Sequence, residues 1–202
     1  MSRRWTLTLR EQPALRLDGR ALNPAALARL DTAAIERLPV QQGRHTLPLA
    51  EFFSVHDSGA SGDDTPQLTL QGDLSRVDHI ALGMAAGELL IDGHAGHHLG
   101  TAQSGGRIDV RGHAGDLAGA ERSGGVLDVA GHVGHHAGGA LPGSTDGMRG
   151  GVFIVRGNAG ERLGDRLRRG SLVVLGDAGD FAASRMVAGT LVVAGSLGAH
   201  PA

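Results

Sequence analysis

The sequence predicts an all-β protein, built mainly as a right-handed parallel β-helix of about six to seven coils, with a small α/β segment at its N-terminal side. The first observation behind this prediction is a glycine period. The anchor glycines lie 19 residues apart, with one interval of 26 residues: Gly93, Gly112, Gly131, Gly157, Gly176 and Gly195. When the positions six before, three after and seven after each anchor are included, 22 of 24 positions are glycine. A period of this length is typical of a solenoid.

The second observation is the apolar pattern between the glycines. Positions four and two before each anchor are apolar, as in Leu127 and Val129, which is typical of a short strand with one buried face. Positions two and six after the anchor are apolar too, so each coil should bury about four side chains and turn its corners at glycine, which accepts a positive φ at little cost. One coil alone cannot offset its backbone entropy, so the coils must stack. The left-handed hexapeptide helix would need a period near 18 residues, which favours the right-handed form.

The third observation is that the period fades toward the N-terminal side. This divides the chain into a capping unit of strand, short helices and loop (residues 1–66) and a repeat domain (residues 67–202). In the first unit, Trp5–Leu9 alternates apolar and polar residues and predicts a strand.

Two short helices are predicted next. Asn23 followed by Pro24 is typical of an N-cap with proline at the first helical position, and predicts a helix to about Leu30. A second helix is expected over Thr32–Leu38, and Pro39 ends it.

The remaining segments are predicted from composition and register. Leu47–Val55 is expected to be an edge segment covering the first coil, and His56–Pro66 a loop. Leu68–Leu74 repeats the glycine register loosely, as a terminal capping coil should. The seven extra residues fall within Ala140–Gly150 and predict a bulge at one corner. The sixth full coil has no evident cap, so we expect a partner or a further segment to cover it.

Composition excludes several classes of function. The 202 residues contain no cysteine, so this chain forms no disulfide, thiolate nucleophile or cysteine-ligated iron–sulfur cluster. Aromatic residues make up 2% of the chain, which argues against base stacking and therefore against nucleic-acid binding. There is no 18-residue apolar run and no signal peptide, so we expect no membrane association and a cytoplasmic location.

Histidine is the candidate for chemistry. His94, His113 and His132 occupy the same register position in three successive coils, where imidazoles could bind a divalent metal or titrate together. Later coils carry Asn158, Asp177 and Ser196 at this position, which favours an outward polar corner. We therefore predict no catalytic, cofactor or metal site on this chain. A stand-alone acyltransferase or a metal-binding protein that uses the histidine ladder stays open as an alternative.

An interface is the preferred functional interpretation of the outward positions. The outward residues three positions before the anchors are charged in the second and third coils. In the later coils they are apolar, at Ile154, Val173 and Val192, and Leu175 lies beside them. We interpret this strip as a surface for another subunit; the alternative is that the N-terminal segment covers it. An arginine cluster close in sequence could face acidic groups of a partner or form a solvated edge: Arg162, Arg166, Arg168 and Arg169.

The repeat carries a family resemblance. The run Gly93-His-Ala-Gly96-His-His-Leu-Gly100 resembles the GxxGxxxG repeat domain of the glutamate synthase large subunit and of the C subunit of formylmethanofuran dehydrogenase. Thr6–Leu9 and Ala33–Pro39 resemble the bacterial version of the latter, the C subunit of the formyltransferase/hydrolase complex of methylotrophs.

This resemblance implies a non-catalytic scaffold in a cytoplasmic hetero-oligomer that moves a formyl unit between methanofuran and tetrahydromethanopterin during one-carbon oxidation. It places the active sites, the methanofuran-type cofactor and the metal on partner subunits, and none of them on this chain. A structural repeat domain like that of glutamate synthase is the second alternative.

Overall fold

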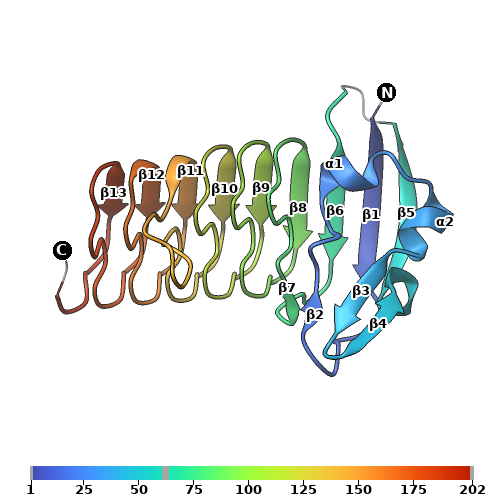
Figure 1. Cartoon of the computed structure of the whole chain (residues 1–202), viewed down its shortest axis with the longest axis horizontal. Coiled ribbons are helices and arrows are strands. Elements are labelled where there is room, and N and C mark those ends of the chain that lie inside the picture. Colours follow the sequence, from blue (N-terminus) through green and yellow to red (C-terminus); the bar gives the residue numbers. More distant parts are fainter. Residues whose placement is uncertain (1, 61–63, 201–202) are drawn as a thin grey trace.

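The computed structural model describes residues 2–60 and 64–200, and its regular structure is mostly β, with few and short helices. The strands form a nine-stranded sheet of order β13-β12-β11-β10-β9-β8-β6-β1-β5 and a four-stranded sheet of order β4-β3-β2-β7. Figure 1 shows the strands of the large sheet side by side along the long axis, with both helices at the N-terminal end. The predicted all-β class is confirmed.

The large sheet consists of β1 (Arg3–Leu9), β5 (Phe53–Ala60), β6 (Gln67–Gln71), β8 (Glu88–Asp92), β9 (Arg107–Val110), β10 (Val126–Val129), β11 (Arg149–Val155), β12 (Arg169–Val174) and β13 (Thr190–Val193). The small sheet consists of β2 (Leu17–Asp18), β3 (Pro39–Gln42), β4 (His45–Pro48) and β7 (Val77–Asp78). The helices are α1 (Pro24–Leu27), α2 (Thr32–Glu36) and the 3-10 turn η1 (Leu49–Glu51).

In the large sheet, β8 to β13 pair parallel to one another in the register of the glycine period, and β6 pairs parallel with β8. Ile108 of β9, for example, pairs with Leu89 on one side and Leu127 on the other. The 26-residue interval does not shift this register, because Val129 of β10 still pairs with Val155 of β11. A second column of parallel bridges runs two residues after each anchor, from Leu74 through Ala95, Ala114, Val133, Ala159 and Ala178 to Leu197.

The predicted inward positions form the core. Side chains four and two before the anchors are buried from β8 to β12: Leu89, Ile91, Ile108, Val110, Leu127, Val129, Phe153, Val155, Leu172 and Val174. Burying each of them contributes about 1.5–3 kcal/mol, which is how stacking offsets the cost of ordering the repeats. In the last repeat Leu191 and Val193 are only partly buried, because no further described strand packs on β13.

The glycines serve two purposes, of which the sequence predicts one. At the described positions six before and seven after the anchors the backbone has a positive φ, as at Gly106 (+69°) and Gly119 (+63°). The predicted corner turns are confirmed at these positions. The anchors from Gly112 onward have no positive φ. A Cβ on Gly112 would lie 2.5 Å from the carbonyl oxygen of Gly93, so the anchors are glycine because successive repeats approach closely.

The N-terminal unit joins the large sheet through its first strand. β1 pairs parallel with β6 and antiparallel with β5, so it extends the sheet past the first repeat. Both helices begin where predicted and end earlier. Asn23 Oδ1 accepts the amide hydrogen of Ala25, and Asp31 Oδ1 accepts that of Ala34.

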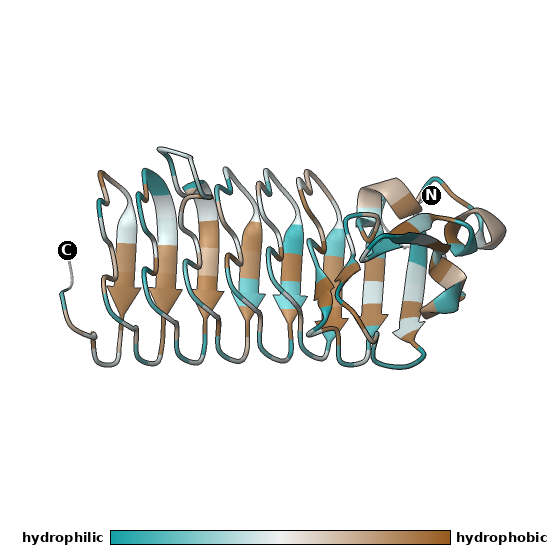
Figure 2. Cartoon of the chain, turned by 60° about the horizontal axis from the view of Figure 1, so that its bottom comes forward, coloured by the Kyte–Doolittle hydropathy of each residue, from teal (hydrophilic) through white to brown (hydrophobic). Residues whose placement is uncertain are grey.

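One predicted loop is a strand. His56–Ala60 belongs to β5, since pairing with β1 and a contact of 2.9 Å between the hydroxyls of Thr6 and Ser58 override its loop-like composition. Residues 61–63 of the predicted loop lie outside the described residues. The predicted edge segment ends in β5, which is an edge strand of the large sheet. It does not lie directly against the first repeat, because β1 stands between β5 and β6. The segment between Ala140 and β11 forms the predicted bulge, and protrudes at one corner (Figure 2).

Candidate functional site: the outer face of the large sheet

The outer face of the large sheet is charged along β9 and β10, and these charges pair with one another. Arg107 donates to both oxygens of Asp109 at 2.7 and 2.6 Å, and Arg156 donates to both oxygens of Asp128 at 2.9 and 2.8 Å. These hydrogen bonds raise the pKa of both guanidinium groups. Arg111 pairs with Asp92 at 3.2 Å. The charged half therefore satisfies its own groups and offers little unpaired charge to a ligand.

From β11 onward the same face becomes apolar. We call the outward side chains Val152, Ile154, Val173, Leu175 and Val192 the apolar strip. Leu175 is 50% exposed, Val192 46% and Val152 37%, while Ile154 and Val173 are half-buried by their neighbours. Figure 2 shows teal bands on β8 to β10, whereas β11 to β13 are brown and white apart from teal where β11 and β12 begin. The hydrophobic groups in this strip would lose contact with water if another surface covered them.

The structure brings four of the predicted interface residues together. Ile154, Val173 and Val192 are successive partners across β11, β12 and β13. Leu175 follows β12 on the same side. The alternative that the N-terminal segment covers this strip is wrong, because that segment packs against β6, at the other end of the sheet. Val152 belongs to the strip and was missed, although its position five before the anchor also alternates outward.

Three of the four predicted arginines contact groups outside the apolar strip. The Arg162 guanidinium lies over the ring of Phe181, with its carbon 5.3 Å from the ring centroid. Arg166 donates to the Ser144 carbonyl at 2.7 Å, and Arg168 forms an ion pair of 2.7 Å with Asp146. Arg169 begins β12. Consequently Arg166 and Arg168 bind the inserted segment rather than continuing the apolar strip.

The histidines one position after the anchors form a hydrogen-bonded stack. The rings of His94, His113 and His132 stack with centroids 4.8 Å apart. Each Nδ1 accepts the backbone N–H of the equivalent residue in the next repeat: His113 at 3.0 Å, His132 at 2.8 Å and Asn158 at 2.8 Å. Asn158 and Asp177 continue the same bond through side-chain oxygens. The residue one position after an anchor must therefore accept a hydrogen bond from the backbone, which an unprotonated imidazole nitrogen can do.

A second ladder runs four residues after the anchors. The Asp116 amide donates to His97 Nδ1 at 2.9 Å, the His135 amide to Asp116 Oδ1 at 2.8 Å and the Glu161 amide to His135 Nδ1 at 3.1 Å. Within residues 2–60 and 64–200, no group of three or more histidine, aspartate or glutamate side chains is placed to hold a metal ion. The Nδ1 atoms of both ladders bind backbone amides, which leaves them unsuited to take a proton as a general base.

Burial lowers the pKa of His113, and the neighbouring His94 and His132 lower it further by charge repulsion. Burial and the stacked ring of His79, 4.7 Å away, lower the pKa of His98. The shift at His113 favours the neutral imidazole that the first ladder needs there.

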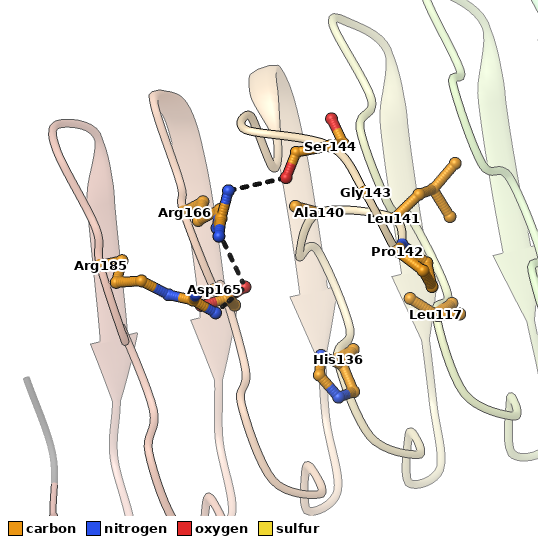
Figure 3. A pocket seen from close by; sticks show the side chains of 10 residues that line it. All are labelled: Leu117, His136, Ala140, Leu141, Pro142, Gly143, Ser144, Asp165, Arg166 and Arg185. Carbon is orange, nitrogen blue, oxygen red and sulfur yellow. Dashed lines mark hydrogen bonds and ion pairs between the residues drawn. The ribbon is translucent and has the colours of Figure 1, made fainter.

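The insertion forms a cavity of about 310 Å³ against the repeats (Figure 3). Asp165, which is buried, accepts three hydrogen bonds of 2.9 to 3.1 Å from Arg185. The Arg166 bond to Ser144 ties the insertion to the same group of charges. His136 of the preceding repeat also lines the cavity, together with Leu141 and Pro142 of the insertion. Arg166 thus holds the insertion, while Arg185 and Asp165 join successive repeats.

No helix in the part of the chain that the structure describes is long and apolar enough to cross a bilayer.

Comparison with known proteins shows the family. No family model matches the chain. A chain in the crystal structure of the formyltransferase/hydrolase complex from Methylorubrum extorquens, in complex with methylofuran, superposes with a TM-score of 0.88 at 37% identity, over 97% of this chain and 72% of that one. The C subunit of the molybdenum-containing formylmethanofuran dehydrogenase 1 of Methanosarcina barkeri is 36% identical over 85 residues. This chain belongs to the family of formylmethanofuran dehydrogenase C subunits. The resemblance found in the sequence is confirmed.

Other members of this family match a similar stretch. In Methanothermobacter wolfeii, the C subunit of the molybdenum-containing formylmethanofuran dehydrogenase 1 is 35% identical over 84 residues, and that of the tungsten-containing enzyme 2 is 28% identical over 95 residues. These matches cover 42% and 47% of this chain, but only 20% and 35% of the two relatives, and 28% of the Methanosarcina barkeri protein. This chain therefore matches about a fifth to a third of the length of its curated relatives.

Proposed function

We propose that this chain is a non-catalytic scaffold subunit of a hetero-oligomeric complex of the formyltransferase/hydrolase type, working in methanofuran- and tetrahydromethanopterin-linked oxidation of formaldehyde to formate. Its similarity to a chain of the Methylorubrum extorquens complex over 97% of its length supports the assembly. In this proposal the methanofuran-type cofactor and the metal belong to partner subunits, and the complex is cytoplasmic.

The proposed architecture is a right-handed parallel β-helix over residues 67–202, with residues 1–66 as its cap. Parallel pairing in a constant register and the second column of bridges support it. Such a stack has a filled interior, and here its polar corner residues bond to the backbone of the next repeat. A rigid rod of this kind suits positioning of other subunits better than catalysis.

The observation that carries the proposed interface is the exposed apolar strip next to a self-neutralised charged face. Protein interfaces have a desolvated apolar centre. Single exposed apolar residues are common on protein surfaces, whereas a contiguous row of them marks an interaction site. Ile154, Val173, Leu175 and Val192 are therefore the proposed contact residues, extended by Val152. Arg162, Arg166, Arg168 and Arg169 are placed at the rim, where a partner's acidic groups would meet them.

Val173→Asp tests the interface. The half-buried Val173 faces outward, so the variant chain should keep its fold, but a carboxylate at the centre of the strip would have to be desolvated by a partner. We expect loss of the partner subunits in affinity purification of the complex, with an unchanged circular dichroism spectrum. Leu90→Asp is the matched control, because Leu90 is the equivalent outward residue of β8. Partners retained by Val173→Asp, or lost equally with Leu90→Asp, would refute this interface.

A further inference from the structure

A second surface feature lies beside the insertion. Thr145, Asp146, Arg149, Arg168 and Arg169 line a groove of about 550 Å³, which we call the cationic groove. It contains three guanidinium groups and one carboxylate. Asp146 neutralises Arg168 through the 2.7 Å ion pair, and Arg168 Nη2 also donates to the Thr145 carbonyl at 3.4 Å. Two positive charges remain without a counter-charge.

Those two charges belong to Arg149 and Arg169, which are direct partners across β11 and β12. Neither side chain makes a hydrogen bond, ion pair or ring contact with any residue in the described ranges. Between residues 67 and 200 they are the only arginines in this condition; the described contacts of the others are with carboxylates, carbonyl oxygens or a phenyl ring. Like charges placed directly opposite one another on neighbouring strands destabilise a sheet.

We propose that the cationic groove binds a small oxyanion carrying two or more negative charges, held between Arg149 and Arg169. A guanidinium group presents a planar pair of N–H donors that matches a carboxylate or a phosphate, so two of them can hold two oxyanion groups of one ligand. Such a ligand would neutralise both charges and relieve their repulsion. The ligand class is a dicarboxylate, a tricarboxylate or a polyphosphate.

The insertion builds this groove. Without the seven extra residues, the chain would pass from one repeat to the next without Thr145 and Asp146. Both residues line the groove and bind the Arg168 guanidinium group. The groove is lined by residues of this chain alone, but two of them, Arg168 and Arg169, are also rim residues of the proposed interface, so the ligand is tested on the chain without partners.

The test uses the full-length chain and measures its melting temperature and, by calorimetry, its affinity for citrate and pyrophosphate. We expect both to bind and to raise the melting temperature, while acetate and sodium chloride at the same ionic strength do not. Binding of only citrate or only pyrophosphate would assign the site to carboxylates or to phosphates. The double variant Arg149→Gln/Arg169→Gln should lose about tenfold or more in affinity, because it removes the charged donors. Without ligand it should be at least as stable as the parent, since the repulsion is gone.

Arg29→Gln/Arg37→Gln is the control, because it removes the same two charges from exposed side chains in the N-terminal unit and should leave binding unchanged. The proposal is overturned if neither multivalent anion binds more tightly than acetate, or if the control loses as much affinity as the groove variant. Val173→Asp should keep oxyanion binding while losing partners. Loss of the groove function and loss of the proposed assembly are thus separate outcomes.

Discussion

At the scale of single residues, Arg122 is the most unusual side chain in the core. It is fully buried, and burial lowers the pKa of its guanidinium to about 10. Instead of a carboxylate it meets backbone carbonyls: Nη1 donates to Val152 at 2.9 Å and Nη2 to Gly124 at 3.0 Å. One repeat earlier, Gln103 binds carbonyl oxygens in the same way. Arg122 and Gln103, which occupy equivalent positions in successive repeats, thus both bind to the strand of the next repeat.

The first prediction concerns Arg122→Met. Keeping this buried group charged costs the folded chain about 3 kcal/mol relative to the unfolded chain. Because the pKa is lowered, that cost is present in full below pH 10 and is relieved only as the pH rises through it. Methionine occupies the equivalent place at Met148, so Arg122→Met should raise the free energy of unfolding at pH 7 by about 1–2 kcal/mol after loss of two hydrogen bonds.

Arg122→Ala is the matched control, since it removes the same charge and leaves a cavity. It should lower the free energy of unfolding by about 2–4 kcal/mol. Urea unfolding of both variants checks this. If methionine destabilises as much as alanine does, the hydrogen bonds outweigh the cost of burying the charge.

The second prediction concerns acid. The lowered pKa of His113 means that protonation favours the unfolded chain, so the stability that the neutral ring provides is full above about pH 6.5 and is lost as the pH falls through the lower folded value. Melting temperatures between pH 8 and pH 5 should therefore fall on the acid side. His94→Asn/His113→Asn/His132→Asn keeps the acceptor, as Asn158 does, and should flatten that dependence. An unchanged acid slope would show that the ladder stays neutral or that other groups dominate.

At the scale of elements, the anchor glycines set the spacing between repeats. A Cβ on Gly112 would press against the Gly93 carbonyl at 2.5 Å and against His94 Nδ1 at 2.6 Å. Neither can move without breaking the pairing or the histidine ladder. Gly164 is different: its φ is +65°, but a Cβ there meets nothing closer than 3.9 Å.

The third prediction compares these two glycines. Gly112→Ala should lower the free energy of unfolding by about 3 kcal/mol or more, because the backbone cannot yield. Gly164→Ala should cost only about 1–2 kcal/mol for the left-handed backbone, and Ala183 already tolerates φ of +59° at the same register position. Chemical denaturation measures both. Equal costs would mean that φ, not space, explains the anchors.

The elements also show what the sequence alone can predict. The strands from β6 to β13 and their buried faces were predictable, because alternation and the glycine period repeat six times. His56–Ala60 was not, since its partner β1 lies far back in the chain and its composition is that of a loop. The apolar strip was found from register, but Val152 was not, and neither was the placement of Arg149 opposite Arg169 without a counter-charge. Their importance depends on which neighbours pair across strands, and that is a property of three-dimensional contacts.

At the scale of the whole molecule, the two ends of the large sheet differ. β1 and β5 extend the sheet beyond β6, and Trp5 and Phe53 are buried there. At the other end β13 pairs only with β12 among the described strands, and Leu197 is 49% exposed. In a stack of repeats, local stability depends on neighbours on both sides.

The fourth prediction follows from this difference. In hydrogen exchange measured by mass spectrometry, amides of β13 should exchange fastest among the repeat strands, and those of β9 and β10 slowest. Leu127→Ala, in the middle of the stack, should speed exchange on both sides. Leu191→Ala should speed exchange mainly in the last repeat. Uniform exchange rates along the whole stack would show that the protein opens as one cooperative unit.

The unbroken pairing of Val129 with Val155 across the long interval has a practical consequence. The strands stay in register although seven extra residues are inserted at one corner. The protein is therefore suited to the insertion of further sequences at this corner. Peptide tags, epitopes or fluorophore-binding sequences spliced into the tip of this excursion, near Gly143, would be displayed at a fixed height along a stiff rod.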